Sequence, residues 1–321
     1  MIKSELESIF YIEPKETSMN LNYFKEFVTL AETRNYWEAS ERLFINQSTL
    51  SKHIKAMEAE LGLPLFERTT RKVALTEFGQ TLLPYAKSIT QIQSAYTAAL
   101  FQQQNQHLGL VTLGSVSPMK LYHITDLISD YQAAFPEYNI HVRENDSNYL
   151  KQMLLTQKCE LAFLREPLDD SGNIRNADSS LIRIPYITDH LVAIVERHNP
   201  LALRQFLTFS DLSQEKLCFF KRNSILFNLC YSACQDAGFL PNVVYDSHYI
   251  GSIFDMVLKS GCVGLLTDHH VAGRRRQDPD GPLAFIPIVP DLSTRISLCY
   301  LENTPLSEGA AAFVDFFTQN L

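Results

Sequence analysis

A short polar stretch in the first sixth of the chain has side chains that suit contact with nucleic acid. Gln47, Ser48 and Thr49 are followed by Ser51 and Lys52. Amide and hydroxyl groups of this kind hydrogen-bond to base edges, and a lysine ammonium binds phosphate. Any amphipathic helix also has a solvated polar face, so the chemistry depends on the elements that hold these residues.

Three amphipathic segments are predicted around this stretch. Apolar residues between positions 21 and 31 recur at spacings of three and four, which predicts a first helix. A second, shorter helix is expected over residues 37–43. Asn46 is a suitable N-cap and Gly62 a C-terminal stop for a third helix, whose core face holds Leu50 and Ile54. The polar residues therefore lie on the first turns of the third helix, away from its core face.

A small basic wing is predicted after the third helix. Residues 66–68 and 72–75 are typical of two short strands joined by a basic tip. Between positions 42 and 72 the chain holds six Lys or Arg and three Glu, although the net charge of the whole chain is −8. Three helices and a wing fit a DNA major groove, which is about 12 Å wide. We therefore predict that the polar face of the third helix reads DNA and that Lys55, Arg68 and Arg71 contact phosphates.

A long helix is predicted from Thr76 to about residue 103. Its apolar positions alternate in steps of three and four, as in a coiled-coil seam, at Leu82, Tyr85, Ile89, Ile92, Tyr96 and Ala99. We expect this helix to form a homodimer, with packing on its own C-terminal domain as the alternative. The glutamine-rich run at 102–106 is expected to close the helix as a polar hinge.

Strand-like and helix-like runs alternate beyond residue 107. The strand-like runs are 110–113, 140–142, 161–164, 191–195, 217–220, 263–266 and 296–300. Alternation of this kind predicts α/β architecture.

Composition and motifs exclude several other classes of protein. No apolar run approaches the about 20 residues of a membrane span, and the start of the chain lacks the features of a secretory signal. Six scattered cysteines do not suit a disulfide framework. The motifs of serine hydrolases, phosphate-binding loops, zinc proteases and dinucleotide-binding enzymes do not occur. We therefore expect a cytoplasmic protein with no membrane contact, no catalytic residues and no cofactor.

Asp268-His269-His270 is the one cluster that resembles metal ligands. Adjacent histidines on a strand point to opposite faces, so no metal site is expected there. A periplasmic solute-binding protein would need a secretory signal and would lack a basic helix-turn-helix, which excludes that class.

The spacing of motifs in the first ninety residues resembles the N-terminal domain of LysR-type transcriptional regulators. The matching positions are Phe24, Ala39, 41–43, Gln47, 50–51, Ile54, Glu58, 61–62, 65–68, 75–79 and 83–86. Runs at 109–114, 135–136, 199–202, 261–264 and 306–307 are similar to the family's effector domain. Lys52 stands where the family usually has arginine. Lysine cannot make a bidentate contact, so its role shifts from base readout toward phosphate.

The resemblance implies an α/β protein in three parts. These are a winged helix-turn-helix (20–78), a linker and dimerisation helix with a hinge (79–107), and an effector-binding domain (108–321). The effector domain would consist of two α/β subdomains resembling periplasmic binding proteins, with subdomain one at 108–184 and 284–321 and subdomain two at 185–283. Residues 1–19 would be an N-terminal extension. Either this extension is disordered, or Met19 is the natural start of the protein. The implied partners are double-stranded DNA, a small-molecule effector and further copies of the chain, as a homodimer or homotetramer.

In this family the effector lies in a cleft between the subdomains, at the carboxyl ends of strands. The residues expected to line it are Ser115, Ser117, Asn145, Asp146, Arg165, Phe220 and Asn223. Arg165 suits a carboxylate or phosphate. Its alternative is an ion pair with a neighbour: Glu166, Asp169 or Asp170. Asp146 would disfavour an anion unless it is paired, so the identity of the ligand stays open.

We therefore predict a sequence-specific transcriptional regulator of the LysR type, controlled by a small polar, anionic effector. The alternative keeps DNA binding and replaces the ligand by oxidant sensing, as in the peroxide-sensing branch of the family. Cys234 lies where that branch has one cysteine of its reactive pair, but Ile225 occupies the position of the other. A disulfide between Cys230 and Cys234, one helical turn apart, would strain a helix.

Overall fold

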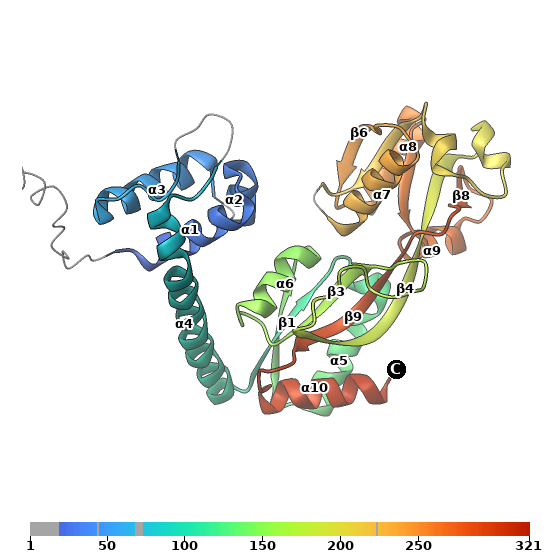
Figure 1. Cartoon of the computed structure of the whole chain (residues 1–321). Helices are drawn as coiled ribbons and strands as arrows, with labels where there is room; N and C mark the ends of the chain where they lie inside the picture. The colour runs from blue at the N-terminus through green and yellow to red at the C-terminus, as the bar shows by residue number, and fades with distance from the viewer. Residues whose placement is uncertain (1–18, 44, 68–72, 223) are drawn as a thin grey trace, which may run out of the picture. The chain divides into compact units, whose positions relative to one another are not determined.

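The computed structural model describes residues 19–43, 45–67, 73–222 and 224–321. They fall into two compact units, one ending at Ala99 and the other beginning at Leu100 (Figure 1). The expected N-terminal extension up to residue 18 lies outside the described residues, as do three predicted contact residues: Arg68, Arg71 and Asn223.

The first unit begins with three helices: α1 (Leu21–Thr33), α2 (Tyr36–Leu43) and α3 (Gln47–Leu61). They confirm the three helices predicted from the apolar spacing. Asn46 occupies the N-cap position of α3 as predicted, but its side chain makes no capping hydrogen bond. Gly62 ends α3 with a φ of 69°, a left-handed conformation that glycine adopts without steric cost.

A small apolar core packs the three helices together. Phe27 and Leu30 of α1 and Leu50 and Met57 of α3 are fully buried in it. After α3 the chain returns as a short hairpin, because residues 66 and 75 form an antiparallel bridge. This bridge confirms the paired stem of the predicted wing, whose tip lies outside the described residues.

Helix α4 (Glu77–Leu108) starts against this wing. The Gly79 N–H donates to Thr76 Oγ1 at 3.1 Å, and the same hydroxyl donates to the Pro64 carbonyl at 2.6 Å. A Cβ at position 79 would lie 2.3 Å from the carbonyl oxygen of Leu65. Only glycine therefore allows this close approach between the helix and the wing.

The polar hinge predicted at residues 102–106 is wrong. This run is helical, and α4 continues to Leu108. Glutamine has a helix propensity close to that of leucine or lysine, so a glutamine run does not end a helix. The helix stops before Gly109, which has a φ of 56°. Neither α4 nor any other helix of the described residues is long and apolar enough to cross a membrane.

The second unit is an α/β domain, as predicted. Its described strands are β1 (Leu110–Ser115), β2 (Asn139–Glu144), β3 (Leu161–Pro167), β4 (Leu181–Glu196), β5 (Lys216–Phe220), β6 (Asn242–Ser247), β7 (Val263–Thr267), β8 (Leu283–Pro287) and β9 (Ser293–Leu301). Their order is β2-β1-β3-β9-β4-β7-β5-β6, with β8 paired to β4. All seven strand-like runs are strands, whereas β6 and β8 were not predicted.

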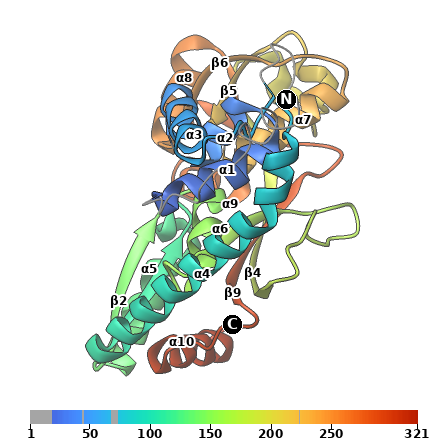
Figure 2. The same cartoon turned by 60° about the vertical axis from the view of Figure 1, so that its left-hand side comes forward.

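Helices cover both faces of each half of this sheet (Figures 1 and 2). They are α5 (Ile124–Ala134), α6 (Ser147–Leu155), α7 (Ile225–Asp236), α8 (Ile250–Ser260), α9 (Asp268–Gln277) and α10 (Glu308–Gln319). A Cβ on Gly114 would meet Leu150 of α6, and a Cβ on Gly309 of α10 would meet Val111. Residues 111 and 114 point to opposite faces of β1, so α6 and α10 lie on opposite sides of the first half.

The two halves are subdomains joined by β4 and β9. Strand β4 pairs with β9 up to His190 and with β7 and β8 from Leu191 onward. The first crossing therefore lies near residue 190 rather than at 184. The predicted return at 284 is also too early, because β8 pairs with β4, and Ile286 and Ile288 lie in the core of the second subdomain. Strand β4 passes from one subdomain to the other without interruption, so no turn residue in the sequence marks the boundary. The missing signal explains why both predicted boundaries are wrong.

Candidate functional site

The predicted DNA-contacting residues of α3 are all accessible. Gln47, Ser48, Lys52 and Lys55 are exposed, and Thr49 and Ser51 are half-buried. They occupy the first turns of the helix, where they can approach a groove together. The opposite face of these turns is held in the core by Leu50 and Ile54.

The two lysines of this face have no carboxylate partner in the described part of the unit. The ion pairs there join Arg42 to Glu38, His53 to Glu26 and Lys87 to Glu32. The second of these pairs fixes α3 on α1, because His53 Nδ1 lies 2.9 Å from Glu26 Oε2 and the ring stacks on Tyr23. The ammonium groups of Lys52 and Lys55 are therefore available to phosphates.

Glu58 holds the stem of the wing against α3. Its Oε1 accepts the backbone N–H of Leu65 at 2.7 Å and that of Phe66 at 3.1 Å. Sequence reasoning gave Glu58 no such role, because an acceptor for a loop seven residues away has no local pattern. The contact fixes residues 65 and 66 of the wing stem on α3.

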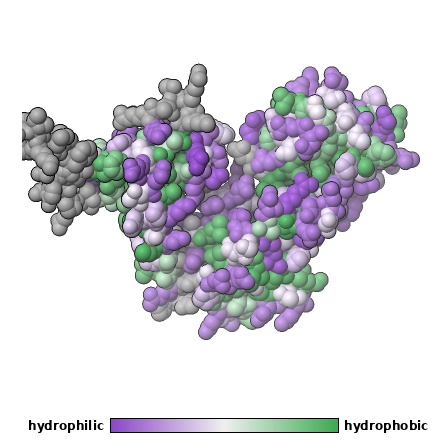
Figure 3. Space-filling model, in the orientation of Figure 1, coloured by the Kyte–Doolittle hydropathy of each residue, from purple (hydrophilic) through white to green (hydrophobic). Residues whose placement is uncertain are grey.

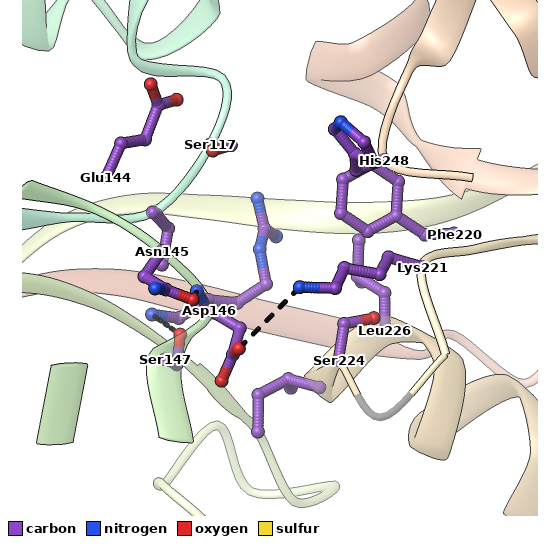
Figure 4. A pocket seen from close by; sticks show the side chains of 13 residues that line it. Ser117, Glu144, Asn145, Asp146, Ser147, Phe220, Lys221, Ser224, Leu226 and His248 are labelled. Carbon is purple, nitrogen blue, oxygen red and sulfur yellow. Dashed lines mark hydrogen bonds and ion pairs between the residues drawn. The ribbon is translucent and has the colours of Figure 1, made fainter. Parts of the chain in front are cut away.

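A pocket of about 350 Å³ lies between the two subdomains of the second unit (Figure 4). The first subdomain lines it with Val116, Ser117, Glu144, Asn145, Asp146, Ser147 and Arg165, and the second with Phe220, Lys221, Ser224, Ile225, Leu226 and His248. Most of these residues follow the carboxyl ends of strands, where open α/β sheets bind ligands. The volume is in the range of small-molecule sites.

Five of the predicted effector residues lie on the pocket wall: Ser117, Asn145, Asp146, Arg165 and Phe220. The prediction for Ser115 is wrong. Its side chain is fully buried and donates to the Val116 carbonyl at 3.3 Å. Ser115 is still within β1, where it pairs with Phe163 of β3, so the chain leaves the sheet only after it.

Arg165 is buried at the base of the pocket, with 5% of its side chain exposed, and carries an ion pair that sequence reasoning did not find. Its Nη1 lies 2.8 Å from Asp189 Oδ2. The same guanidinium donates to Thr294 Oγ1 and to the hydroxyl of Tyr122. Glu166, one of the expected partners, pairs instead with Arg183 at 2.8 Å. Asp189 is 24 positions from Arg165 along the chain, so the pair cannot be read from local spacing.

This cluster lies where β4 crosses between the subdomains. Asp189 is completely buried, and its carboxylate also accepts from the Tyr122 hydroxyl at 2.7 Å and contacts His269 Nδ1 at 3.0 Å. Burial acts to raise the pKa of Asp189, but the hydrogen bond from His269 and the charge of Arg165 outweigh it, so this pKa lies well below its usual range. The carboxylate therefore stays ionised and neutralises Arg165.

Two neighbouring histidines of α9 respond to this cluster in opposite ways. Hydrogen bonds to Asp189 and Asp268 raise the pKa of His269 to about 9. Burial, followed by the charge of Arg165, lowers the pKa of His270 to about 3. His270 is 4% exposed, and neither ring nitrogen has a hydrogen-bond partner among the described residues. At neutral pH, His269 is thus protonated and His270 is neutral.

Asp189, Asp268 and His269 bring donor atoms within 4.8 Å of one another, the one such group of possible metal ligands in the described residues. Asp268-His269-His270 begins α9, so the expected strand there is wrong. Asp189 is already bonded to Arg165 and Tyr122. We therefore interpret Asp189, Asp268 and His269 as a cluster of side chains that hydrogen-bond to one another and to their protein neighbours.

The two walls of the pocket carry opposite charges (Figure 4). Glu144 and Asp146 line the first subdomain, whereas Lys221 and His248 line the second. Lys221 Nζ lies 4.0 Å from Asp146 Oδ2, which bridges the two walls. Asp146 also caps α6 by accepting the Tyr149 N–H at 3.0 Å. The negative charge of Asp146, which would disfavour an anionic ligand, is therefore partly offset by Lys221 on the opposite wall.

Sequence reasoning missed more of the second wall than of the first. Lys221 lies within the predicted strand-end segment 220–223, and Ser224 directly follows it, but neither was named as a contact residue. Ser224 is the N-cap of α7 and accepts the Phe227 N–H at 3.1 Å. His248 follows β6, a strand that was not predicted, so the strand-end pattern could not identify it.

The cysteine expected in the oxidant-sensing alternative is deeply buried. Cys234 lies in α7 with no exposed surface, and burial raises its pKa to about 12. The nearby Cys230 is also buried, and burial raises its pKa as well. Reactive cysteines are thiolates in accessible, electropositive surroundings. Cys234 does not have that environment.

Two family models match the chain. The model of the LysR substrate binding domain matches residues 104–321, and that of the bacterial regulatory helix-turn-helix protein, lysR family, matches residues 21–80. The hydrogen peroxide-inducible genes activator of Dickeya chrysanthemi is 25% identical over 289 residues, which cover 90% of this chain and 91% of that protein.

Solved structures show the same fold. Full-length OxyR from Pseudomonas aeruginosa, studied as a variant, has a TM-score of 0.51 at 19% identity and covers 93% of this chain and 99% of that one. Full-length CbnR in complex with its target DNA has a TM-score of 0.50 at 18% identity and covers 94% of this chain and 100% of that one. The two matched domains span almost the whole described chain, in the order helix-turn-helix and then ligand-binding domain. The protein therefore belongs to the LysR family of DNA-binding transcriptional regulators, which are not enzymes.

Proposed function

We propose that this regulator reads duplex DNA with the first turns of α3 and is controlled by a small molecule bound between its effector subdomains. The observation that carries the proposal is the 350 Å³ pocket with opposite charges on its two walls. A ligand that contacts both subdomains favours one arrangement of them, and a few kcal/mol of differential affinity is enough to shift a population. A protein with this function acts in the cytoplasm, where the chromosome is.

On the DNA side, we assign base contacts to Gln47, Ser48, Thr49 and Ser51. Lys52 and Lys55 are exposed cations without ion-pair partners in the described residues and are assigned to phosphates. Arg68 and Arg71 keep the phosphate role proposed from the sequence.

We propose that α4 joins two copies of the chain. Tyr85 and Ile92 are each 66% exposed and Tyr96 is 49% exposed, although all three belong to the predicted seam. An apolar seam on an exposed helix matches the a and d positions of a coiled coil. Apolar patches also interrupt the polar surface of the effector unit (Figure 3), and Leu203 there is 89% exposed. These patches are consistent with a second interface, so the assembly is a homodimer or a homotetramer.

The charges of the pocket favour an effector that is polar and carries an anionic group. Lys221 provides the cation for that group, and the imidazole of His248 on the same wall can take part in hydrogen bonds to it. Glu144 and Asp146 on the facing wall suit an ammonium or hydroxyl donor at the other end of the ligand. Arg165 contributes hydrogen-bonding surface rather than net charge, because Asp189 neutralises it.

The oxidant-sensing alternative through Cys234 has weaker support. It needs a reactive thiolate, whereas Cys234 is buried with a raised pKa, and Ile225 stands at the partner position. The relative from Dickeya chrysanthemi is too distant to transfer its effector to this chain.

The DNA assignment is tested with genomic fragments selected by the purified full chain. Gln47→Ala should reduce the preference for a selected fragment over random DNA by about 1–3 kcal/mol, or about 5- to 150-fold, because a base contact is lost. Gln91→Ala, an exposed glutamine of α4, is the matched control. An unchanged preference in Gln47→Ala would remove α3 from base readout.

The dimer assignment is tested by light scattering. Ile89→Asp combined with Ile92→Asp should halve the molar mass, because charge is placed in the apolar seam. Ser94→Asp adds charge to an exposed polar position of the same helix and should leave the mass unchanged. An unchanged mass in the double variant would exclude α4 as an interface.

The effector assignment is tested by thermal shift with amino acids, amines and mono- and dicarboxylic acids. A compound at about 100 times its Kd stabilises the protein by about 2.7 kcal/mol. Lys221→Ser and Ser117→Ala should weaken this effect, and Lys216→Ser, an exposed lysine of β5 outside the pocket, should not. Equal stabilisation of all three variants would place the ligand elsewhere.

A further inference from the structure

The single tryptophan of the chain, Trp37, lies on the surface of the DNA-binding unit. It belongs to the first turn of α2 and is 64% exposed. Among the described residues its indole has no ring contact, and its backbone N–H, but not its side chain, is hydrogen-bonded, to Asn35 Oδ1 at 2.9 Å. Tryptophan combines a large apolar area with one N–H donor, so it is well adapted to interfaces. The exposed indole therefore indicates a surface that another molecule covers.

An unpaired cation lies three positions before this tryptophan. Arg34 ends α1 with a φ of 52°, a left-handed conformation that glycine adopts at lower cost. Its side chain is exposed, and its guanidinium has no carboxylate partner in the part of the unit that the structure describes. The turn between α1 and α2 therefore presents a guanidinium as well as an indole to the solvent.

The carboxylates that border this turn are already paired. Glu32 Oε1 lies 2.8 Å from Lys87 Nζ, and Glu38 Oε1 lies 2.8 Å from Arg42 Nη2. Glu41, the remaining carboxylate of α2, belongs to its last turn rather than its first. The turn between the two helices is therefore net positive, which favours an anionic partner.

The place of α2 in the fold identifies this partner. Helix α2 packs on both α1 and α3 (Figure 1), with Ala39 and Ser40 buried. In a helix-turn-helix, the second helix enters the major groove and the first helix crosses the sugar–phosphate backbone. With α3 in the groove, α2 is that first helix. Its first turn and the turn before it are then placed at phosphates rather than at base edges.

We propose that Arg34 and Trp37 form a second DNA contact surface, which binds the sugar–phosphate backbone beside the groove that α3 reads. The indole N–H donates to a phosphate oxygen while the ring packs on a deoxyribose, and the guanidinium pairs with a phosphate. Contacts of this kind add affinity and fix the orientation of the protein, but carry no sequence information. The proposal rests on the proposed role of α3 and extends the DNA interface to the preceding helix.

The fluorescence of Trp37 reports on this surface in the unmodified full chain, because the chain has no other tryptophan. Acrylamide, a neutral quencher that leaves the ionic strength unchanged, should quench the indole strongly in the free protein. Saturation with the selected fragment or with a random duplex should remove most of this quenching, because the DNA covers the ring. The anisotropy of labelled DNA measures binding independently of Trp37.

Variants separate the two contacts. Trp37→Phe keeps an aromatic ring but loses the N–H donor, so it should weaken binding to selected and random DNA alike by about tenfold. The slope of log K against log salt should stay the same, because the indole is neutral, whereas Arg34→Ala should reduce this slope by about 0.9. Tyr249→Phe and Arg275→Ala are matched controls at exposed positions of the second unit and should change neither quantity.

Four results would overturn the proposal. They are an indole already shielded in the free protein, an indole still open to acrylamide when anisotropy shows bound DNA, parent affinity in Trp37→Phe, and a loss in this variant confined to the selected fragment. The quenching of the parent protein decides the matter even if a variant does not fold. A parent protein that binds no DNA would overturn the proposed function together with this surface, whereas bound DNA without shielding would overturn only the surface.

Discussion

The candidate DNA contacts of α3 lie within nine consecutive positions of one helix, from Gln47 to Lys55, whereas the pocket collects its wall from segments between Val116 and His248. The first surface is a local structure supported by a small core. The second exists only after two subdomains have folded and two crossing strands have set their spacing. Contact residues of the helix are exposed or half-buried, but the base of the pocket is a buried ion pair.

This difference predicts that substitutions in the two regions affect different properties of the protein, namely DNA binding or folding stability. A side chain exposed on α3 can be replaced with little effect on folding, because it leaves no unsatisfied group behind. Arg165 and Asp189 cannot, because removal of either leaves a buried charge without its partner. Substitutions on α3 should therefore act on affinity, whereas substitutions of the ion pair at the base of the pocket should act on folding.

The strongest test of this contrast is Asp189→Ala. The change leaves the Arg165 guanidinium buried without its carboxylate and should lower the free energy of unfolding of the effector unit by about 3–5 kcal/mol. Asp291→Ala, which removes the exposed partner of His190, should cost less than about 1 kcal/mol. Urea denaturation of the full chain measures both. If both variants lost less than about 1 kcal/mol of unfolding free energy, the Arg165–Asp189 pair would not be required for stability.

A second test asks whether the DNA-binding unit also has a position where shape controls stability. Gly79→Ala places a Cβ 2.3 Å from the Leu65 carbonyl oxygen, so the start of α4 must shift away from the wing. We expect a loss of about 1–3 kcal/mol in unfolding free energy, measured by denaturation. Gly273→Ala, in α9, has no atom within 4 Å of the added carbon and should be neutral or stabilising. Equal effects of the two substitutions would contradict this close approach.

The same contrast explains which features the sequence could predict. The helix-turn-helix and the residues on α3 followed from apolar spacing and caps, which are local. Ser117, Asn145 and Asp146 followed from the strand-end rule, and Ser115 failed because β1 continues to Ser115, two residues beyond the predicted run 110–113. Partners that meet through the tertiary fold, such as Asp189 for Arg165, have no periodic pattern and were not predictable.

A smaller effect is expected for Lys52→Ala. If Lys52 contacts one phosphate, its removal should reduce the slope of log K against log salt by about 0.9 and weaken binding to all sequences alike. Stability should change by less than about 0.5 kcal/mol, because the ammonium has no protein partner among the described residues. Titrations at several salt concentrations measure the slope. A selective loss for the preferred site would instead assign Lys52 to base readout.

The smallest effect concerns pH and the two histidines beside the pocket base. The pKa of His269 is raised to about 9, so its interaction with Asp189 stabilises the fold fully below about 6.5 and is lost as pH rises through 9. The pKa of His270 is lowered to about 3, so the unfolded chain binds a proton more readily below about 6.5 and stability falls as the pH drops from there toward 3. The effector unit should therefore be most stable near pH 6.5 and lose stability both as the pH falls toward 3 and as it rises toward 9.

Denaturation of the parent protein and of His269→Gln at pH 6 and at pH 9.5 tests this expectation. At pH 6 the parent protein should be the more stable of the two, because only its protonated imidazole brings a positive charge to its contact with the Asp189 carboxylate. At pH 9.5 the difference should shrink, since the imidazole has lost its charge. His190→Gln is the matched control, because His190 pairs with Asp291 at the surface, where solvent weakens the interaction. A difference between parent and His269→Gln that stays constant with pH would mean that His269 contributes by packing alone, and that the charge at the pocket base is carried only by Arg165 and Asp189.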